Sequence, residues 1–151
     1  MTPTLLGRWQ TRLLLFLVLG LPLTFLYAWI YAGFDVFDID TNFFLVLVVL
    51  FVVGFILDPV YIWLQGFRWD HDWPFAFQFF FSFIEFGIVL ALIYFDVLWF
   101  LPSFLLSDFD GFLVILGHFL TVFIPSFLAL LGFIQIFLVR WRFKAAELGR
   151  L

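Results

Sequence analysis

The sequence predicts an all-α integral membrane protein, with four transmembrane helices forming one domain over residues 1–151. Of the 151 residues, 66% are hydrophobic and 12% are charged. Four long apolar runs alternate with short polar connections, and basic residues occur in only some of these connections. Soluble domains contain about a quarter charged residues, and so apolar a chain has too little polar surface to cover a core in water. We therefore expect lipid to be its solvent.

The first expected span is residues 13–34, which follows a short polar lead, residues 1–12. This run contains no charged residue and exceeds the roughly 20 residues that a helix needs to cross the hydrocarbon core. A cleavable signal peptide has a shorter apolar region, of roughly 7–15 residues. The run also carries Tyr27, Trp29 and Tyr31 near its end, as in the aromatic belt of a membrane interface. We expect an uncleaved first helix.

The second and third expected spans are residues 43–64 and 75–101. Asp58 and Pro59 interrupt the second run near its far end. Proline disfavours helical geometry in the residue before it, so this helix is expected either to kink or to end early there. Asp96 interrupts the third run late. Both runs are long enough to cross a bilayer.

The fourth expected span is residues 112–139, which at 1.5 Å per residue reaches roughly 40 Å and requires tilt or projection beyond the bilayer. Orientation follows from the basic residues, which occur only before the first span, between the second and third, and after the fourth: Arg8, Arg12, Arg68, Arg140, Arg142, Lys144 and Arg150. The positive-inside rule then predicts two helical hairpins with both termini cytoplasmic. The expected location is a bacterial inner or plasma membrane, or an organellar or thylakoid-type membrane.

Polar residues inside the third span are the first candidates for chemistry. Glu85 lies deep in this span, and Gln78 and Ser82 precede it by seven and three residues, so the three share one helical face. A carboxyl group in hydrocarbon is costly and usually faces a partner or a cavity. Glu85 is therefore either part of a proton relay or ion site, or a neutral group hydrogen-bonded to a neighbouring helix or subunit.

His118 and Thr121 are the matching candidates in the fourth span. Counting the rise along two antiparallel helices places Glu85 and His118 at similar depths, so a contact between them is one hypothesis. A second is that His118 is a cofactor ligand, axial to a haem or chlorophyll-type tetrapyrrole. A third is that it is a packing histidine with a satisfied hydrogen bond.

A charged cluster is predicted at the membrane interface between the second and third spans: Asp58, Arg68, Asp70, His71 and Asp72. These side chains include metal-capable types, but neighbours in sequence rarely converge on one ion. We expect them to pair with each other and fix the hairpin, without a metal.

Several classes of function are excluded or disfavoured by the composition. The absence of cysteine excludes disulfides, thiolate metal sites and cysteine nucleophiles. A formal net charge of −4 argues against nucleic acid as a partner. The chain contains no phosphate loop, dinucleotide fingerprint, His-Glu-x-x-His or Gly-x-Ser-x-Gly pattern. No catalytic residue is identified, and a non-enzymatic role is favoured.

Three hypotheses about function remain. The one the sequence favours is a non-enzymatic accessory or scaffold subunit of a larger membrane complex, in an energy-transducing or photosynthetic membrane for example. Its partners are then the lipid bilayer and other membrane subunits, or further copies of itself. The second is an oligomeric proton-coupled transporter or membrane enzyme that uses Glu85 and His118. The third is a protein that binds a pigment, a haem or a quinone. The accessory or scaffold subunit of the first hypothesis would need no cofactor or only a lipid.

Overall fold

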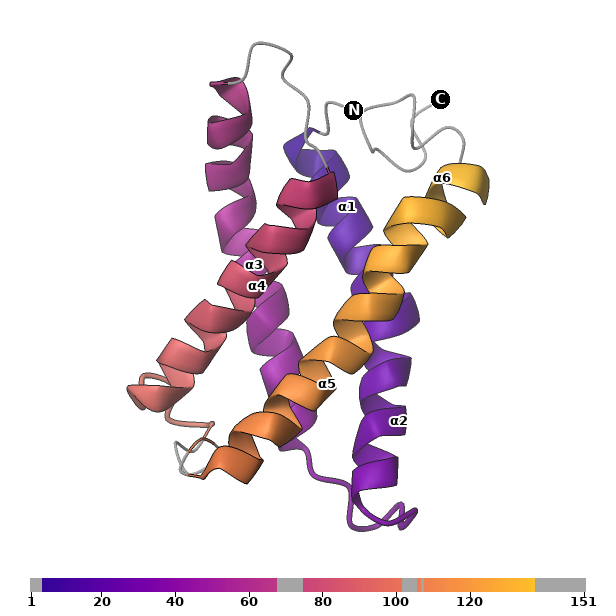
Figure 1. The fold of residues 1–151 in the computed structure, drawn as a ribbon, viewed down its shortest axis with the longest axis vertical. Helices are drawn as coiled ribbons and strands as arrows, with labels where there is room; N and C mark the ends of the chain where they lie inside the picture. The colour runs from indigo at the N-terminus through magenta and orange to yellow at the C-terminus, as the bar shows by residue number, and fades with distance from the viewer. Residues whose placement is uncertain (1–3, 68–74, 102–105, 107, 138–151) are drawn as a thin grey trace.

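The computed structural model describes residues 4–67, 75–101, 106 and 108–137 (Figure 1). Over these residues the chain forms helices and no strand. Four helical segments are long and apolar enough to cross a membrane: Leu5–Tyr31, Asn42–Gly66, Ala76–Tyr94 and Phe109–Phe133. The prediction of an all-helical chain with four candidate spans is confirmed.

The first span begins earlier than predicted and consists of α1 (Leu5–Leu15), the π-helical turn η1 (Phe16–Gly20) and α2 (Leu21–Tyr31). Thr4 caps α1, because its hydroxyl oxygen accepts a hydrogen bond from the backbone N–H of Gly7 at 3.1 Å. The residues predicted as a polar lead outside the membrane helix therefore belong largely to its first turns. The start of the helix was predicted too late because the span was defined as a run without charged residues, and such a run can begin only after Arg12.

The first span ends in a tight helix terminus. Gly33 adopts a φ of 66°, the N–H of Phe34 donates to the carbonyl of Trp29 at 2.9 Å, and the N–H of Gly33 donates to Ile30 at 3.1 Å. This is the Schellman pattern, in which a left-handed residue closes the last turn. The helix therefore stops at Tyr31, three residues before the predicted end at residue 34.

The second span, α3 (Asn42–Gly66), runs without a break through Pro59, so the helix does not end early at Asp58. The third span, α4 (Phe75–Tyr94), ends seven residues before the predicted boundary at residue 101. Asp96 takes a positive φ of 54° there, and the backbone N–H groups after Tyr94 turn back to helix carbonyls. A residue in the left-handed conformation, Asp96, therefore ends α4, although the apolar sequence continues beyond it.

The fourth span consists of α5 (Phe109–Leu128), the π-helical turn η3 (Ala129–Phe133) and the short α6 (Ile134–Phe137). It begins three residues before the predicted start at residue 112, and residues 138–139 of the prediction lie outside the described part. Pro125 sits within α5, and η3 follows directly. The π-helical turn η3 therefore lies just after Pro125, which lacks the backbone N–H that the helix would otherwise use as a hydrogen-bond donor.

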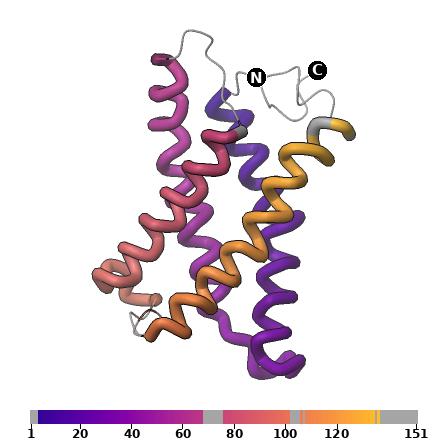
Figure 2. The backbone as a smooth tube through the Cα atoms, viewed as in Figure 1, coloured from indigo at the N-terminus to yellow at the C-terminus, as the bar shows by residue number. Residues whose placement is uncertain are grey.

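Successive spans run in alternating directions, so α1 begins at the end of the bundle where α3 ends, α4 begins and α6 ends (Figures 1 and 2). We call this end the terminal end. Helix α3 contacts α1, α2 and α4, while α5 packs mainly against η1 and α2. The buried apolar core is built from α3, α4, α5 and the segment after α4: Val46, Val49, Val53, Phe86, Val89, Ile93, Leu101, Ile115 and Phe119. Polar groups gather instead nearer the terminal end.

Candidate functional site

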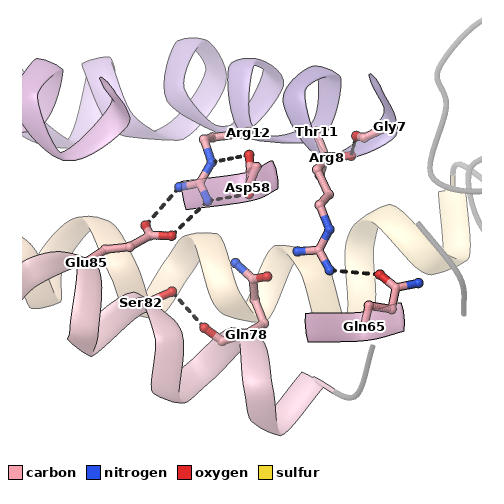
Figure 3. A network of polar contacts seen from close by, with 9 residues as sticks. All are labelled: Gly7, Arg8, Thr11, Arg12, Asp58, Gln65, Gln78, Ser82 and Glu85. Atoms are coloured by element: carbon pink, nitrogen blue, oxygen red, sulfur yellow. Dashed lines mark hydrogen bonds and ion pairs between the residues drawn. The ribbon is translucent and has the colours of Figure 1, made fainter. Parts of the chain in front are cut away.

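One arginine lies between two carboxylates from two other helices (Figure 3). Arg12 Nε and Nη2 donate to the two oxygens of Asp58 at 3.1 and 3.0 Å. Nη1 and Nη2 donate to the two oxygens of Glu85, each at 2.9 Å. Both pairs are two-pronged, the geometry in which an arginine binds a carboxylate most specifically. We call Arg12, Asp58 and Glu85 the charge cluster.

The helices bring these three residues to one depth. Arg12 is seven residues after the start of α1, Asp58 eight before the end of α3, and Glu85 ten after the start of α4. At 1.5 Å per residue, all three lie about 10–15 Å from the terminal end. Asp58 is 1% and Glu85 4% exposed. The charges therefore meet inside the bundle.

Gly54, one turn before Asp58 on α3, makes room for the guanidinium. A Cβ atom at Gly54 would overlap Nη1 and Cζ of Arg12 and would lie 2.8 Å from Oε2 of Glu85. A residue with a Cβ atom therefore requires the ends of the Arg12 and Glu85 side chains to shift. The present arrangement of the charge cluster depends on the absence of a side chain at Gly54.

A second arginine balances the charge. Arg8 is one helical turn before Arg12, is buried, and donates from Nη2 to the side-chain oxygen of Gln65 at 3.3 Å. Two arginines and two carboxylates sum to zero formal charge. This neutrality matters because an uncompensated charge away from water costs several kcal/mol or more.

A cavity of about 190 Å³ borders the charge cluster. Its polar wall consists of Arg8, Thr11, Arg12, Asp58, Gln78, Ser82, Glu85 and Ser126. The rest is apolar and strongly aromatic, with Phe16, Phe51, Phe119, Phe123 and Phe127 among the lining residues. The cavity thus has a charged side formed by α1, α3 and α4, and an aromatic side formed mainly by α5.

The predicted face of α4 lines this cavity. Gln78, Ser82 and Glu85 all contribute to its wall, and the Ser82 hydroxyl donates to the backbone carbonyl of Gln78 at 2.8 Å. The side-chain amide of Gln78 lies between the charge cluster and Gln65 in Figure 3. The three residues therefore form one polar surface, with Glu85 at its ion-paired end.

His118 and Thr121 lie elsewhere. His118 is 2% exposed, and its Nε2 is 2.9 Å from the hydroxyl oxygen of Thr24. The rings of Tyr27 and Phe43 lie 5.4 and 5.3 Å from the imidazole. The Thr121 hydroxyl donates to its own helix, to the carbonyl of Gly117 at 2.8 Å. Neither residue lines the cavity, and the packing around His118 leaves little space for a large flat cofactor.

The hypothetical contact between Glu85 and His118 is not formed among the described residues, because Glu85 binds Arg12 and His118 binds Thr24. One atom of His118 stays without a hydrogen-bond partner there, the buried Nδ1. The imidazole and the charge cluster are therefore two separate polar sites.

The predicted interfacial cluster falls mostly outside the described residues: Arg68, Asp70, His71 and Asp72. Its remaining member, Asp58, binds Arg12, a partner that the sequence interpretation did not name. Within the described ranges, no group of three histidine or acidic side chains is arranged to hold a metal ion.

The residues of the candidate site that the sequence analysis missed are the two N-terminal arginines. Arg8 and Arg12 are four residues apart, the spacing that puts two side chains on one helical face. Thr4 before them is a favourable helix cap. Extending the first helix back to Leu5 on these two signals would have placed both arginines opposite the acidic groups of the second and third spans.

Comparisons with protein-family models, with curated proteins and with solved structures find no match for this chain. Its function must therefore be inferred from the charge cluster and the cavity beside it.

Proposed function

We propose that this chain is an oligomeric, proton-coupled membrane carrier that binds a small molecule in the cavity beside the charge cluster. The observation that carries the proposal is a cavity inside a membrane-type helix bundle whose wall includes two arginines and two carboxylates. Ionisable residues within transmembrane segments typically mark ligand, ion or proton pathways. Because four spans are few for a carrier, we expect copies of the chain to assemble.

Stability alone is a weak reason to keep such a cluster. Well-packed apolar residues of similar volume often stabilise a protein as well as a buried ion pair does. The cavity also has room for about six water molecules at roughly 30 Å³ each. A charge-lined space of this size suits a small polar molecule better than it suits a packing contact.

We further propose that the spans form two hairpins with both termini cytoplasmic. With Arg8 and Arg12 assigned to the bundle interior, five basic residues remain for the positive-inside rule, and all belong to the connection between α3 and α4 or to the C-terminal tail: Arg68, Arg140, Arg142, Lys144 and Arg150. The charge cluster would then lie in the cytoplasmic half of the membrane. A bacterial inner or plasma membrane, or an organellar or thylakoid-type membrane, suits this orientation.

Cysteine accessibility tests the carrier proposal, because the chain contains no cysteine of its own. Ser82→Cys and Ser126→Cys each place one thiol in the cavity wall. In proteoliposomes of known orientation, a carrier exposes these thiols to a small membrane-impermeant thiol reagent from both sides of the membrane in turn. The measured quantity is the labelling rate from each side.

The matched control is Ile84→Cys, two residues from Ser82 on the same helix. Ile84 is 50% exposed on the bundle surface and does not line the cavity, so a thiol there faces lipid and should not react. If both cavity thiols are as unreactive as this control, the cavity is closed to water and the carrier proposal fails.

An accessory or scaffold subunit of a larger membrane complex is the second candidate function. It is favoured by large apolar side chains on the outer face of α4, such as Phe80 at 63% and Ile84 at 50% exposed. Gentle solubilisation from the native membrane tests it: a large particle of fixed stoichiometry would support a subunit, and a homo-oligomer would support a carrier. A pigment-, haem- or quinone-binding role receives less support, because His118 is enclosed and bound to Thr24.

A further inference from the structure

We propose that the cavity binds a small monocarboxylate with an apolar body, and that Glu85 takes up one proton when this anion binds. The inference rests on the proposed carrier function and names the ligand class and the coupling residue. Three features support it: the cavity's shape and lining, its two arginines and its charge balance.

The aromatic side of the cavity suits an apolar ligand body. Phe119, Phe123 and Phe127 follow one another at four-residue spacing along α5, and their rings are stacked with centroids 5.3 and 5.6 Å apart. All three line the cavity. Its volume of about 190 Å³ is similar to that of an engineered cavity of roughly 150 Å³ that binds benzene. A single ring or a short branched chain is therefore the size of group that fits.

The charged side suits a carboxylate. Arg8 and Arg12 both line the cavity from α1, and a guanidinium presents a planar set of donors that matches a carboxylate. The Gln78 amide and the Ser126 hydroxyl line the same space and supply neutral donors. A monocarboxylate thus finds donors on one side and rings on the other.

Charge balance then requires a proton. The charged and titratable groups around Glu85 are Arg8 and Arg12 from α1, and Asp58 and Tyr61 from α3, while the lining residues of α5 and η3 are uncharged. With two arginines and two carboxylates the site is neutral, so a bound anion leaves one excess negative charge. Since such a charge is costly away from water, proton uptake restores neutrality.

Glu85 is the carboxylate we assign to this step. Both carboxylates line the cavity, but Glu85 shares its face of α4 with the polar side chains of Gln78 and Ser82 and is the more exposed of the two, at 4% against 1% for Asp58. The ligand carboxylate replaces an oxygen of Glu85 at Arg12, and the released glutamate forms an O–H bond with a proton that hydronium or a buffer acid in the surrounding solution gives up. One anion and one proton enter together, with no change of oxidation state.

Two probes test this inference with the full chain in lipid nanodiscs: benzoate, and benzenesulfonate, which stays ionised at every working pH. Isothermal titration calorimetry in buffers of different ionisation enthalpy measures both affinity and protons taken up. The dissociation constant of each probe should rise with pH, by about tenfold per pH unit wherever one proton is taken up per anion. The proton count needs only the unmodified protein, so it holds even if a variant fails to fold.

Matched variants identify the proton acceptor. Glu85→Gln mimics the protonated glutamate, so it should bind both probes with an affinity that no longer depends on pH. Asp58→Asn also leaves the site with one excess positive charge, so by the same charge balance it should bind without a proton, but more weakly than Glu85→Gln because the ligand still has to displace the Glu85 carboxylate from Arg12. If Glu85→Gln keeps the tenfold slope with benzoate, the neutral acid is the bound species and the coupling role of Glu85 is refuted.

Different experimental outcomes would contradict the proposed carrier function and the monocarboxylate inference. If Ser82→Cys and Ser126→Cys react with thiol reagents but neither probe binds or slows their labelling, the monocarboxylate inference is wrong while the carrier proposal stands. Binding of octanoate without benzoate would also overturn it, because the cavity would then take a lipid-like chain rather than a compact acid. If the thiols are inert, the carrier proposal fails first.

Discussion

Replacing Gly54 with alanine should destabilise this protein, although alanine is the better helix former. The added Cβ atom would overlap the guanidinium of Arg12 and approach Oε2 of Glu85 to 2.8 Å. Disrupting a buried ion pair costs about 3–5 kcal/mol, and the glycine-to-alanine change in a helix returns about 1 kcal/mol. The free energy of unfolding should therefore fall by about 2–4 kcal/mol.

Gly87→Ala is the matched control. A Cβ atom at Gly87, on α4, would meet nothing within 4 Å, so this variant should be unchanged or more stable by up to about 1 kcal/mol. Both variants can be unfolded with sodium dodecyl sulfate in mixed micelles and followed by tryptophan fluorescence. Equal stability of the two variants would refute the packing of Arg12 against Gly54.

A double-mutant cycle identifies the cause of the loss. If Gly54→Ala acts by displacing the arginine, it should cost little in an Arg12→Leu background, where no guanidinium remains to be displaced. An unchanged penalty in that background would mean that the alanine disturbs the α3 backbone instead.

The remaining predictions concern the other buried polar contacts and use the same unfolding titration. Arg12→Leu should cost about 3–5 kcal/mol by leaving one excess negative charge on Asp58 and Glu85, and adding Glu85→Gln, which balances Arg8 against Asp58, should recover much of that loss; no recovery would mean that the arginine contributes by packing. Thr24→Val should cost about 1–3 kcal/mol because it leaves Nε2 of His118 without its partner, while Thr24→Ser should cost less. No loss for valine would refute the contribution of the hydrogen bond, because valine keeps the methyl group of Thr24 and lacks only its hydroxyl.

The sequence was sufficient to predict four membrane-type helices, because each apolar run is long and nearly free of charge. It also placed Gln78, Ser82 and Glu85 on one face, since helical periodicity alone fixes that relation. Helix ends were predicted less well. Left-handed residues stop the first and third spans at Tyr31 and Tyr94, and a hydropathy pattern carries no signal for a single backbone angle.

The partners of the buried charges were not predicted, for a different reason. Treating every arginine as a marker of the aqueous side placed Arg12 outside the membrane, although it lies on the same helix as the apolar run. Which carboxylate an arginine contacts depends on how three helices pack. Asp58 follows Arg12 by 46 positions in the sequence and Glu85 follows it by 73, and only the packing of the helices brings the three together. The local sequence does not indicate which distant residues will be in contact in the folded protein.

These long separations have a consequence for how the protein is made. In the proposed membrane orientation, the first helix enters the bilayer with Arg12 before the helices that carry its partners have been synthesised. A guanidinium costs about 2.5–3.5 kcal/mol at the centre of a membrane helix and less at the position of Arg12, seven residues after the start of α1. Asp58 arrives with the second span and Glu85 with the third. The N-terminal helix should therefore settle at its final depth only after the third span has left the ribosome. Nascent chains stopped before Glu85 should hold their first helix loosely, so the second of the two carboxylates in the charge cluster determines when the first helix is fixed in place.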